Sequence, residues 1–112
     1  MLTFTFLLFL CAGIFLVTGL IMWKFPPKEI NSLYGYRTRA SMEDDASWEL
    51  AQKVSTNWML RIGTGYFILG ALGFPLELHE GVEALLGMAV VIAGVIVLFV
   101  KVEGVLKKGL KN

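Results

Sequence analysis

Between Lys28 and Ser41 the chain carries a dense run of side chains that can hydrogen-bond or pair with charges. Amide, phenol, hydroxyl and guanidinium groups bind polar ligands or cross-link a loop, and the planar fork of arginine makes paired bonds to a carboxylate or phosphate. Apolar residues in this run follow neither a helical nor a strand period, so we expect a structured loop. Its candidate ligand- or partner-binding residues are Asn31, Tyr34, Tyr36, Arg37, Thr38 and Arg39.

This run is not accompanied by a set of residues for covalent or acid-base catalysis. The chain has one histidine, His79, and one cysteine, Cys11, and both lie far from the run along the sequence. A catalytic nucleophile needs an adjacent base. His79 and Glu83 are four residues apart, but no second histidine follows, and Gly81 interrupts the segment. We therefore expect no catalytic residues, no metal and no cofactor.

Five residues in and around the run are expected to be architectural. Pro26 and Pro27 end the preceding helix, because proline lacks a backbone donor and clashes with the turn before it. Gly35, between two tyrosines, supplies a positive φ at a sharp turn. Trp48 and Trp58 lie on one face of a helix that starts near Ser41–Asp44, where the spacing is that of a capping box.

The elements that position this polar run are apolar enough to lie in a membrane. The 112 residues are 56% hydrophobic and 17% charged, more apolar than a soluble domain of this length can bury. Three apolar runs, at about 2–23, 58–76 and 84–100, approach the length that crosses a hydrocarbon core. The first run lacks the basic start and the cleavage site of a signal peptide, so we expect it to be retained.

The predicted fold class is an all-α membrane protein, a single domain over residues 1–112. It has three transmembrane helices, and a structured cytoplasmic loop and an interfacial helix, at 24–57, join the first to the second. The interfacial helix either bends or runs straight into the second span. Small residues on the second and third spans predict close helix packing and allow a homo-oligomer; they are Gly63, Gly70, Gly73, Gly87, Ala89, Ala93 and Gly94.

The placement of the positive charges predicts the orientation in the membrane. All ten Lys and Arg residues lie either in Lys24–Arg61 or after Val100, where Lys111 is the last of them. The turn at 77–83 is acidic, and we expect it to be solvated. The positive-inside rule then places the loop and the C-terminus in the cytoplasm and the N-terminus outside. A net charge of +1 gives no indication of a nucleic-acid partner.

The polar run and its flanks resemble the signature of the SdpI/YfhL family of bacterial membrane proteins. The resemblance covers essentially the whole chain and adds Gln52 and Lys53 to the candidate binding residues. The archetype of the family is about twice as long, so this chain is similar to its later part. The matching residues are Phe25-Pro26-Pro27-Lys28, Ile30-Asn31, Leu33-Tyr34-Gly35-Tyr36-Arg37-Thr38, Ser41-Met42, Trp48 and Ala51-Gln52-Lys53.

The resemblance implies an integral protein of the bacterial cytoplasmic membrane that gives immunity to a sporulation-delaying peptide toxin. It also implies membrane lipids, the peptide toxin and a cytosolic repressor as partners, the repressor less so in a short form. Two alternatives stay open on the residues alone. One is a small membrane enzyme that acts on lipid or peptide and grips a head group with Arg37, Arg39 and Glu49. The other is a subunit of a transporter or channel.

Overall fold

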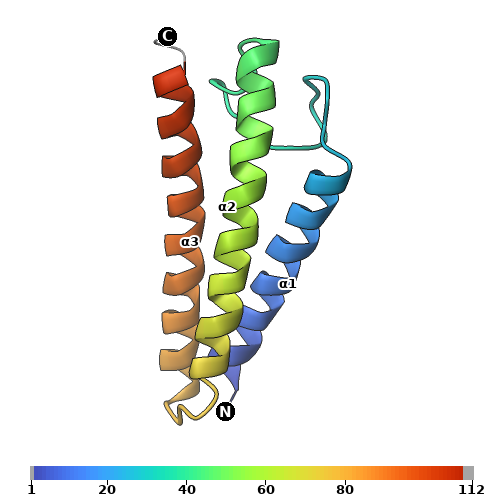
Figure 1. Cartoon of the computed structure of the whole chain (residues 1–112). Coiled ribbons are helices and arrows are strands. Elements are labelled where there is room, and N and C mark those ends of the chain that lie inside the picture. Colours follow the sequence, from blue (N-terminus) through green and yellow to red (C-terminus); the bar gives the residue numbers. More distant parts are fainter. Residues whose placement is uncertain (1, 110–112) are drawn as a thin grey trace.

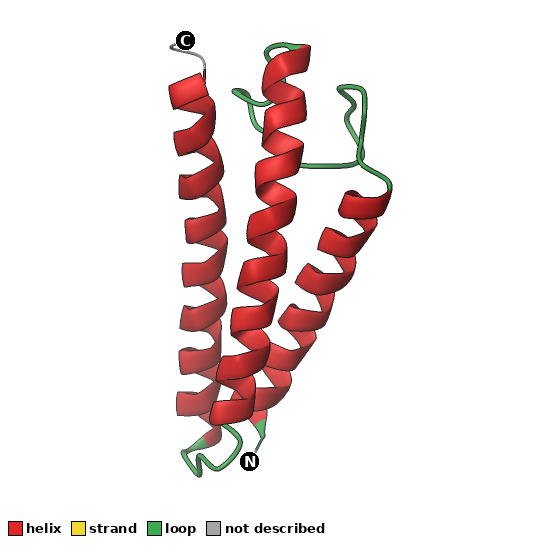
Figure 2. Ribbon diagram, viewed as in Figure 1, coloured by secondary structure: helices red, strands yellow, loops and turns green. Residues whose placement is uncertain are grey.

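A computed structural model describes residues 2–109 of the chain as an elongated bundle of three helices, 50 × 26 × 21 Å in extent. The helices are α1 (Thr3–Lys24), α2 (Asp45–Leu72) and α3 (Glu80–Gly109), joined up, down and up (Figure 1). No strand occurs within the described range (Figure 2). The 25–44 loop and the C-terminal end of α3 lie at one end of the bundle, and the 73–79 turn lies at the other beside the start of α1. Lys111 is outside the described residues.

Two of the helices are long and apolar enough to cross a membrane, namely α1 and α3. Both expose large apolar side chains along their length, such as Ile14 in α1 and Ile96 in α3. An exposed apolar surface of this extent is costly in water and is the surface that lipid covers. The all-helical, membrane-compatible fold class is therefore confirmed, whereas a third span through α2 stays a prediction.

The second helix is a single, straight element of 28 residues. It runs from the expected interfacial segment directly into the second apolar run and ends at Leu72, so Pro75 lies beyond it. Its N-cap is Asp44, whose carboxylate accepts a hydrogen bond of 2.7 Å from the Ser47 amide. The helix thus begins near the place expected, but the cap is Asp44 rather than Ser41. Ser41 instead closes a loop turn, with its Oγ accepting a 2.8 Å bond from the Thr38 amide.

Glycines let α1 approach α2 closely. A methyl group built on Gly63 would lie 2.9 Å from Leu16, and one on Gly70 would lie 2.8 Å from Phe9. Gly94 in α3 has no room for a Cβ either, because the Tyr66 hydroxyl occupies that space and donates to the Val91 carbonyl. The small-residue faces expected on these helices are therefore packing surfaces within the bundle. Ala89 and Ala93 are exposed, and a homo-oligomer through them stays a prediction.

The turn at 77–83 is not fully solvated, which corrects the sequence-based expectation. Helix α3 already begins at Glu80, and Glu83 in its first turn is only 1% exposed. The Glu83 carboxylate accepts a 3.2 Å bond from the amide of Phe4, in the first turn of α1. The first turn of a helix leaves amides without internal partners, and Leu2 at the N-cap of α1 offers no side-chain acceptor. Glu83 therefore caps α1 from a neighbouring helix.

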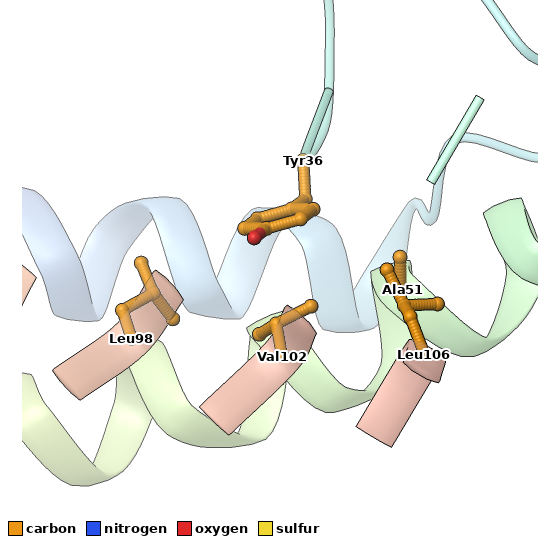
Figure 3. Close-up of a cluster of buried hydrophobic side chains, with 5 residues drawn as sticks. All are labelled: Tyr36, Ala51, Leu98, Val102 and Leu106. Atoms are coloured by element: carbon orange, nitrogen blue, oxygen red, sulfur yellow. The ribbon is translucent and has the colours of Figure 1, made fainter. Parts of the chain in front are cut away.

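Buried side chains gather at both ends of the bundle. Phe4, Leu8, Ala12 and Tyr66 pack together near the 73–79 turn. The second cluster joins one loop residue to α2 and α3, and Figure 3 shows the Tyr36 ring lying over Leu98 and Val102 of α3. This second cluster fixes the loop to the bundle; its members are Tyr36, Ala51, Leu98, Val102 and Leu106.

Candidate functional site: the loop between α1 and α2

Gln52, in α2, holds the centre of the loop. Its side-chain oxygen accepts a 2.8 Å bond from the Tyr36 amide, and its side-chain nitrogen donates a 2.8 Å bond to the Tyr36 carbonyl. The loop can lie this close to α2 because Gly35 turns it with a φ of +104°, as the sequence predicts. A Cβ on Gly35 would lie 2.7 Å from the side chains of both Gln52 and Pro27. Glycine is required there for its conformation and for its size.

Trp48 fixes the start of the loop in the same way. Its indole nitrogen donates a 2.6 Å bond to the Pro27 carbonyl, and the side chain is 1% exposed. Pro27 is buried, whereas Pro26 is exposed. The pair joins the segment after α1 to the first turn of α2, and the architectural role of both residues stays a prediction.

Asn31 and Tyr34 shape the part of the loop that extends away from the bundle. The Asn31 side-chain oxygen accepts bonds of 2.9 and 2.7 Å from the amides of Leu33 and Tyr34, which is an Asx turn. The Tyr34 hydroxyl donates a 2.6 Å bond to the Phe25 carbonyl. Both side chains are therefore used in building the loop.

Glu103, in α3, is the site residue that sequence reasoning missed. Its Oε2 accepts a 2.7 Å bond from the Tyr36 hydroxyl and a 2.8 Å bond from the Thr38 hydroxyl. Burial, together with the bond to and the charge of Glu103, raises the pKa of Tyr36 well above its usual value. The sequence offered one indication of this role. Glu103 is a single carboxylate in the segment after Val100, where all other charged side chains are lysines.

The remaining predicted binding residues face outward. Arg37 is exposed, and its guanidinium donates to the Ser32 carbonyl. Arg39 is also exposed. Lys53 lies 3.9 Å from Glu49 one turn earlier on the exposed face of α2. The structure thus divides the predicted binding residues into two groups. The first group makes hydrogen bonds that build the loop: Tyr36 and Gln52 are buried, and Asn31, Tyr34 and Thr38 are partly buried. The second group consists of three exposed cations, Arg37, Arg39 and Lys53.

A cleft of about 780 Å³ opens between the end of α1 and the first turns of α2. One wall is largely apolar and comes from the end of α1 and the two prolines. The other wall is charged and polar, and comes from the loop start and from α2. A cleft of this size and mixed character suits an amphipathic ligand. Its lining residues are Met22, Trp23, Pro26, Pro27, Lys28, Glu29, Asp45, Glu49, Gln52, Lys53, Thr56 and Asn57.

The fold and the site together define a class of protein: a small helical membrane protein whose elaborate polar loop is bonded to one end of the bundle. A family model of the SdpI/YfhL protein family matches residues 28–101, which include the loop from Lys28 onward and its partners in α2. The chain belongs to the SdpI/YfhL family.

One relative from Bacillus subtilis (strain 168) is YfhL, described as an uncharacterized protein. It is 34% identical to this chain over 95 residues, which cover 85% of this chain and 81% of the relative. No solved structure matches the chain. The family assignment therefore stands on sequence, and the helices, the loop bonds and the cleft come from the structure of this chain.

Proposed function

We propose that this protein gives a bacterial cell resistance to a membrane-active peptide toxin of the sporulation-delaying type, by binding the toxin or a cytosolic regulator. The observation that carries the proposal is that residues matched by the family model line a cleft at the end of α1. Lys28, Gln52 and Lys53 are among these residues.

The chemistry of the cleft supports an amphipathic peptide as the ligand. Trp23 and Met22 give an apolar wall that continues from the apolar surface of α1. Lys28 and Lys53 give positive charge on the other wall, and three carboxylates from the loop and α2 give negative charge. A peptide that partitions into the membrane interface presents apolar side chains and a polar backbone at the same depth.

The topology assigned in this proposal has three spans, with the loop in the cytoplasm. All described Lys and Arg residues lie between Lys24 and Arg61 or from Lys101 onward in α3, and α3 ends at the same end of the bundle as the loop (Figure 1). By the positive-inside rule this end faces the cytoplasm. A toxin reaches the cleft from within the inner leaflet, and a regulator reaches it from the cytosol.

The competing enzyme hypothesis needs Arg37, Arg39 and Glu49 to grip one head group. Only Glu49 lines the cleft; neither arginine is among its lining residues. The transporter hypothesis lacks a charged side chain in the middle of α1. These placements favour binding over catalysis or transport.

Protection of sensitive cells tests the proposal. Cells that express the protein should survive a higher concentration of a sporulation-delaying peptide than cells with an empty vector. Double substitution of Lys28→Gln and Trp23→Ala should abolish most of this protection at an unchanged level of protein in the membrane, because it removes a charge and an aromatic wall from the cleft. Lys107→Gln, a charge change away from the cleft, is the matched control.

A second variant, Arg37→Lys, tests whether the ligand binds the outer surface of the loop instead of the cleft. Lysine keeps the charge but cannot make paired bonds with the guanidinium's fixed geometry. If Arg37→Lys lowers protection while the cleft variant does not, the binding surface is the loop exterior. If the wild type protects against no peptide of this class, the proposed function is wrong.

A further inference from the structure

Cationic side chains from two helices lie over the ring of Trp58. The guanidinium carbon of Arg61, in α2, lies 5.0 Å from the centre of the Trp58 ring system. The ammonium nitrogen of Lys101, in α3, lies 5.5 Å from it. Both cations are exposed, whereas Trp58 is half-buried against the cluster that fixes the loop. The negative face of an indole attracts cations, so one tryptophan gathers two positive charges on the α2–α3 surface.

Among the described residues, no carboxylate is paired with either of these two cations. Within residues 2–109 neither Arg61 nor Lys101 forms a salt bridge, in contrast to the exposed pair of Lys53 and Glu49. The positions one turn away from Arg61 in α2 hold Asn57 and Gly65, neither of them acidic. Two like charges held by the same ring repel one another, and an anion bound to both relieves that repulsion.

The position of Lys101 along α3 indicates that the anion comes from a lipid head group. Lys101 lies about 32 Å along α3 from Glu80, at 1.5 Å per residue, which is close to the roughly 30 Å thickness of a hydrocarbon core. With Glu80 at one boundary of the core, Lys101 lies near the other boundary, where the core meets the phosphate groups. Tryptophan is enriched at this boundary, and long cationic side chains reach from it into the head-group layer.

On each helix, exposed apolar surface follows the cation toward the 73–79 turn. A Cβ on Gly65, one turn after Arg61, would find nothing within 4 Å. Ile68 follows on α2 and is 53% exposed, and Val97, one turn before Lys101 on α3, is 39% exposed. This surface suits an acyl chain that descends from a phosphate held at Trp58.

We propose that Arg61, Lys101 and Trp58 bind the phosphate of one anionic phospholipid, with its acyl chains along Gly65, Ile68 and Val97. A zwitterionic choline lipid fits less well, because its own cation would lie beside two others. Free phosphate would use the cations but not the apolar surface. The site is on the α2–α3 surface and does not depend on the proposed toxin resistance.

Native mass spectrometry of the full chain in detergent tests this site. The protein is incubated with equal amounts of phosphatidylglycerol and phosphatidylcholine, and the fraction that retains one lipid of each kind is measured. Wild type should retain phosphatidylglycerol several-fold more often than phosphatidylcholine. Arg61→Gln and Lys101→Gln should each lower that retention several-fold, and the double variant by roughly tenfold or more, because each removes a charge-assisted bond to phosphate.

Lys107→Gln makes the same charge change on α3 away from Trp58, and it should leave retention unchanged. Circular dichroism of each variant in phosphatidylcholine micelles checks the fold; because Arg61 and Lys101 lie on different helices, either variant alone measures the site if the other fails to fold. Equal losses in Lys107→Gln would show non-specific charge attraction and overturn the site. Equal retention of the two lipids, or displacement of phosphatidylglycerol by millimolar inorganic phosphate, would overturn the assignment of an anionic lipid.

Discussion

At the scale of single residues, the loop depends on side chains that come from other elements. Gln52 of α2 bonds to both backbone groups of Tyr36, and Glu103 of α3 accepts from the hydroxyls of Tyr36 and Thr38. Buried polar groups need such partners, because leaving them unpaired costs about 1–3 kcal/mol each. The loop conformation therefore requires α2 and α3 to be in place.

Gln52→Ala should lower the free energy of unfolding by about 2 kcal/mol or more, because it leaves the buried Tyr36 amide without its acceptor. Thermal or denaturant unfolding of the protein in detergent measures the loss. Lys53→Ala, at the exposed neighbouring position, is the control and should change stability little. A Gln52→Ala protein as stable as the control would mean that the loop is not held by this bond.

Tyr36 should make the stability depend on pH at the alkaline end. Its folded-state pKa is raised above the unfolded value of 10.0, so the fold favours the protonated phenol. The contribution is fully present below pH 10 and is lost progressively as the pH rises above 10. Melting temperatures between pH 8 and 11 should therefore fall more steeply for wild type than for Tyr36→Phe. Parallel curves for the two proteins would contradict the assignment.

At the scale of elements, the helices divide their glycines between contact and open surface. Gly63 of α2 is buried against Leu16 and Phe15 of α1, whereas a Cβ on Gly104 of α3 would find nothing within 4 Å. The same residue type thus has opposite effects at the two positions. In an open helical position glycine only adds flexibility to the unfolded chain, and in a contact it sets the distance between helices.

Gly104→Ala should raise the free energy of unfolding by about 0.5–1 kcal/mol, because alanine is the better helix former and meets no neighbour. Gly63→Ala should lower it despite the same gain in helix propensity, because its Cβ would lie 2.9 Å from Leu16 and 3.1 Å from the Phe15 Cβ. Parallel melts of the two variants in one detergent measure the difference. Stabilisation by both substitutions would show that α1 and α2 are not in close contact at Gly63.

At the scale of the whole molecule, the loop and the last turns of α3 share one end of the bundle, and the acidic turn shares the other with the start of α1 (Figure 1). This arrangement agrees with the charge distribution from which the orientation in the membrane is predicted. It also places the cleft and the tryptophan with its two cations in the same half of the protein. We therefore expect both proposed binding sites to face the membrane leaflet beside the loop.

Labelling in intact cells should show that this end faces the cytoplasm. In a Cys11→Ser background, a cysteine at position 80 should react with a membrane-impermeant maleimide, and one at position 37 should react only after the membrane is made permeable. Both native residues, Glu80 and Arg37, are exposed in the structure. A cysteine that fails to react at either position is therefore shielded by the membrane and not by burial in the protein. Reaction at position 37 in intact cells would overturn the three-span orientation.

Much of the fold and part of the site could be predicted from local sequence. The charge-free first run, the two prolines and the glycine between two tyrosines each act through their immediate neighbours, so their consequences are visible in the sequence. The cap at Asp44 was missed because Ser41 offers the same local chemistry three residues earlier. The sequence also left open whether the helix bends before Ile62, because no residue there distinguishes a bend from a continuous helix.

The sequence by itself determined that the chain is helical, that it suits a membrane, and that residues 28–41 form a structured polar loop. Composition, apolar run length and backbone restrictions are properties of short segments. Only the tertiary structure decided which polar side chains build the loop and which face outward, and that Glu103, Glu83 and Lys101 have partners on other elements. Those bonds join residues 43 to 79 positions apart. Such contacts depend on how three helices pack, and that packing places chemically similar side chains in different roles.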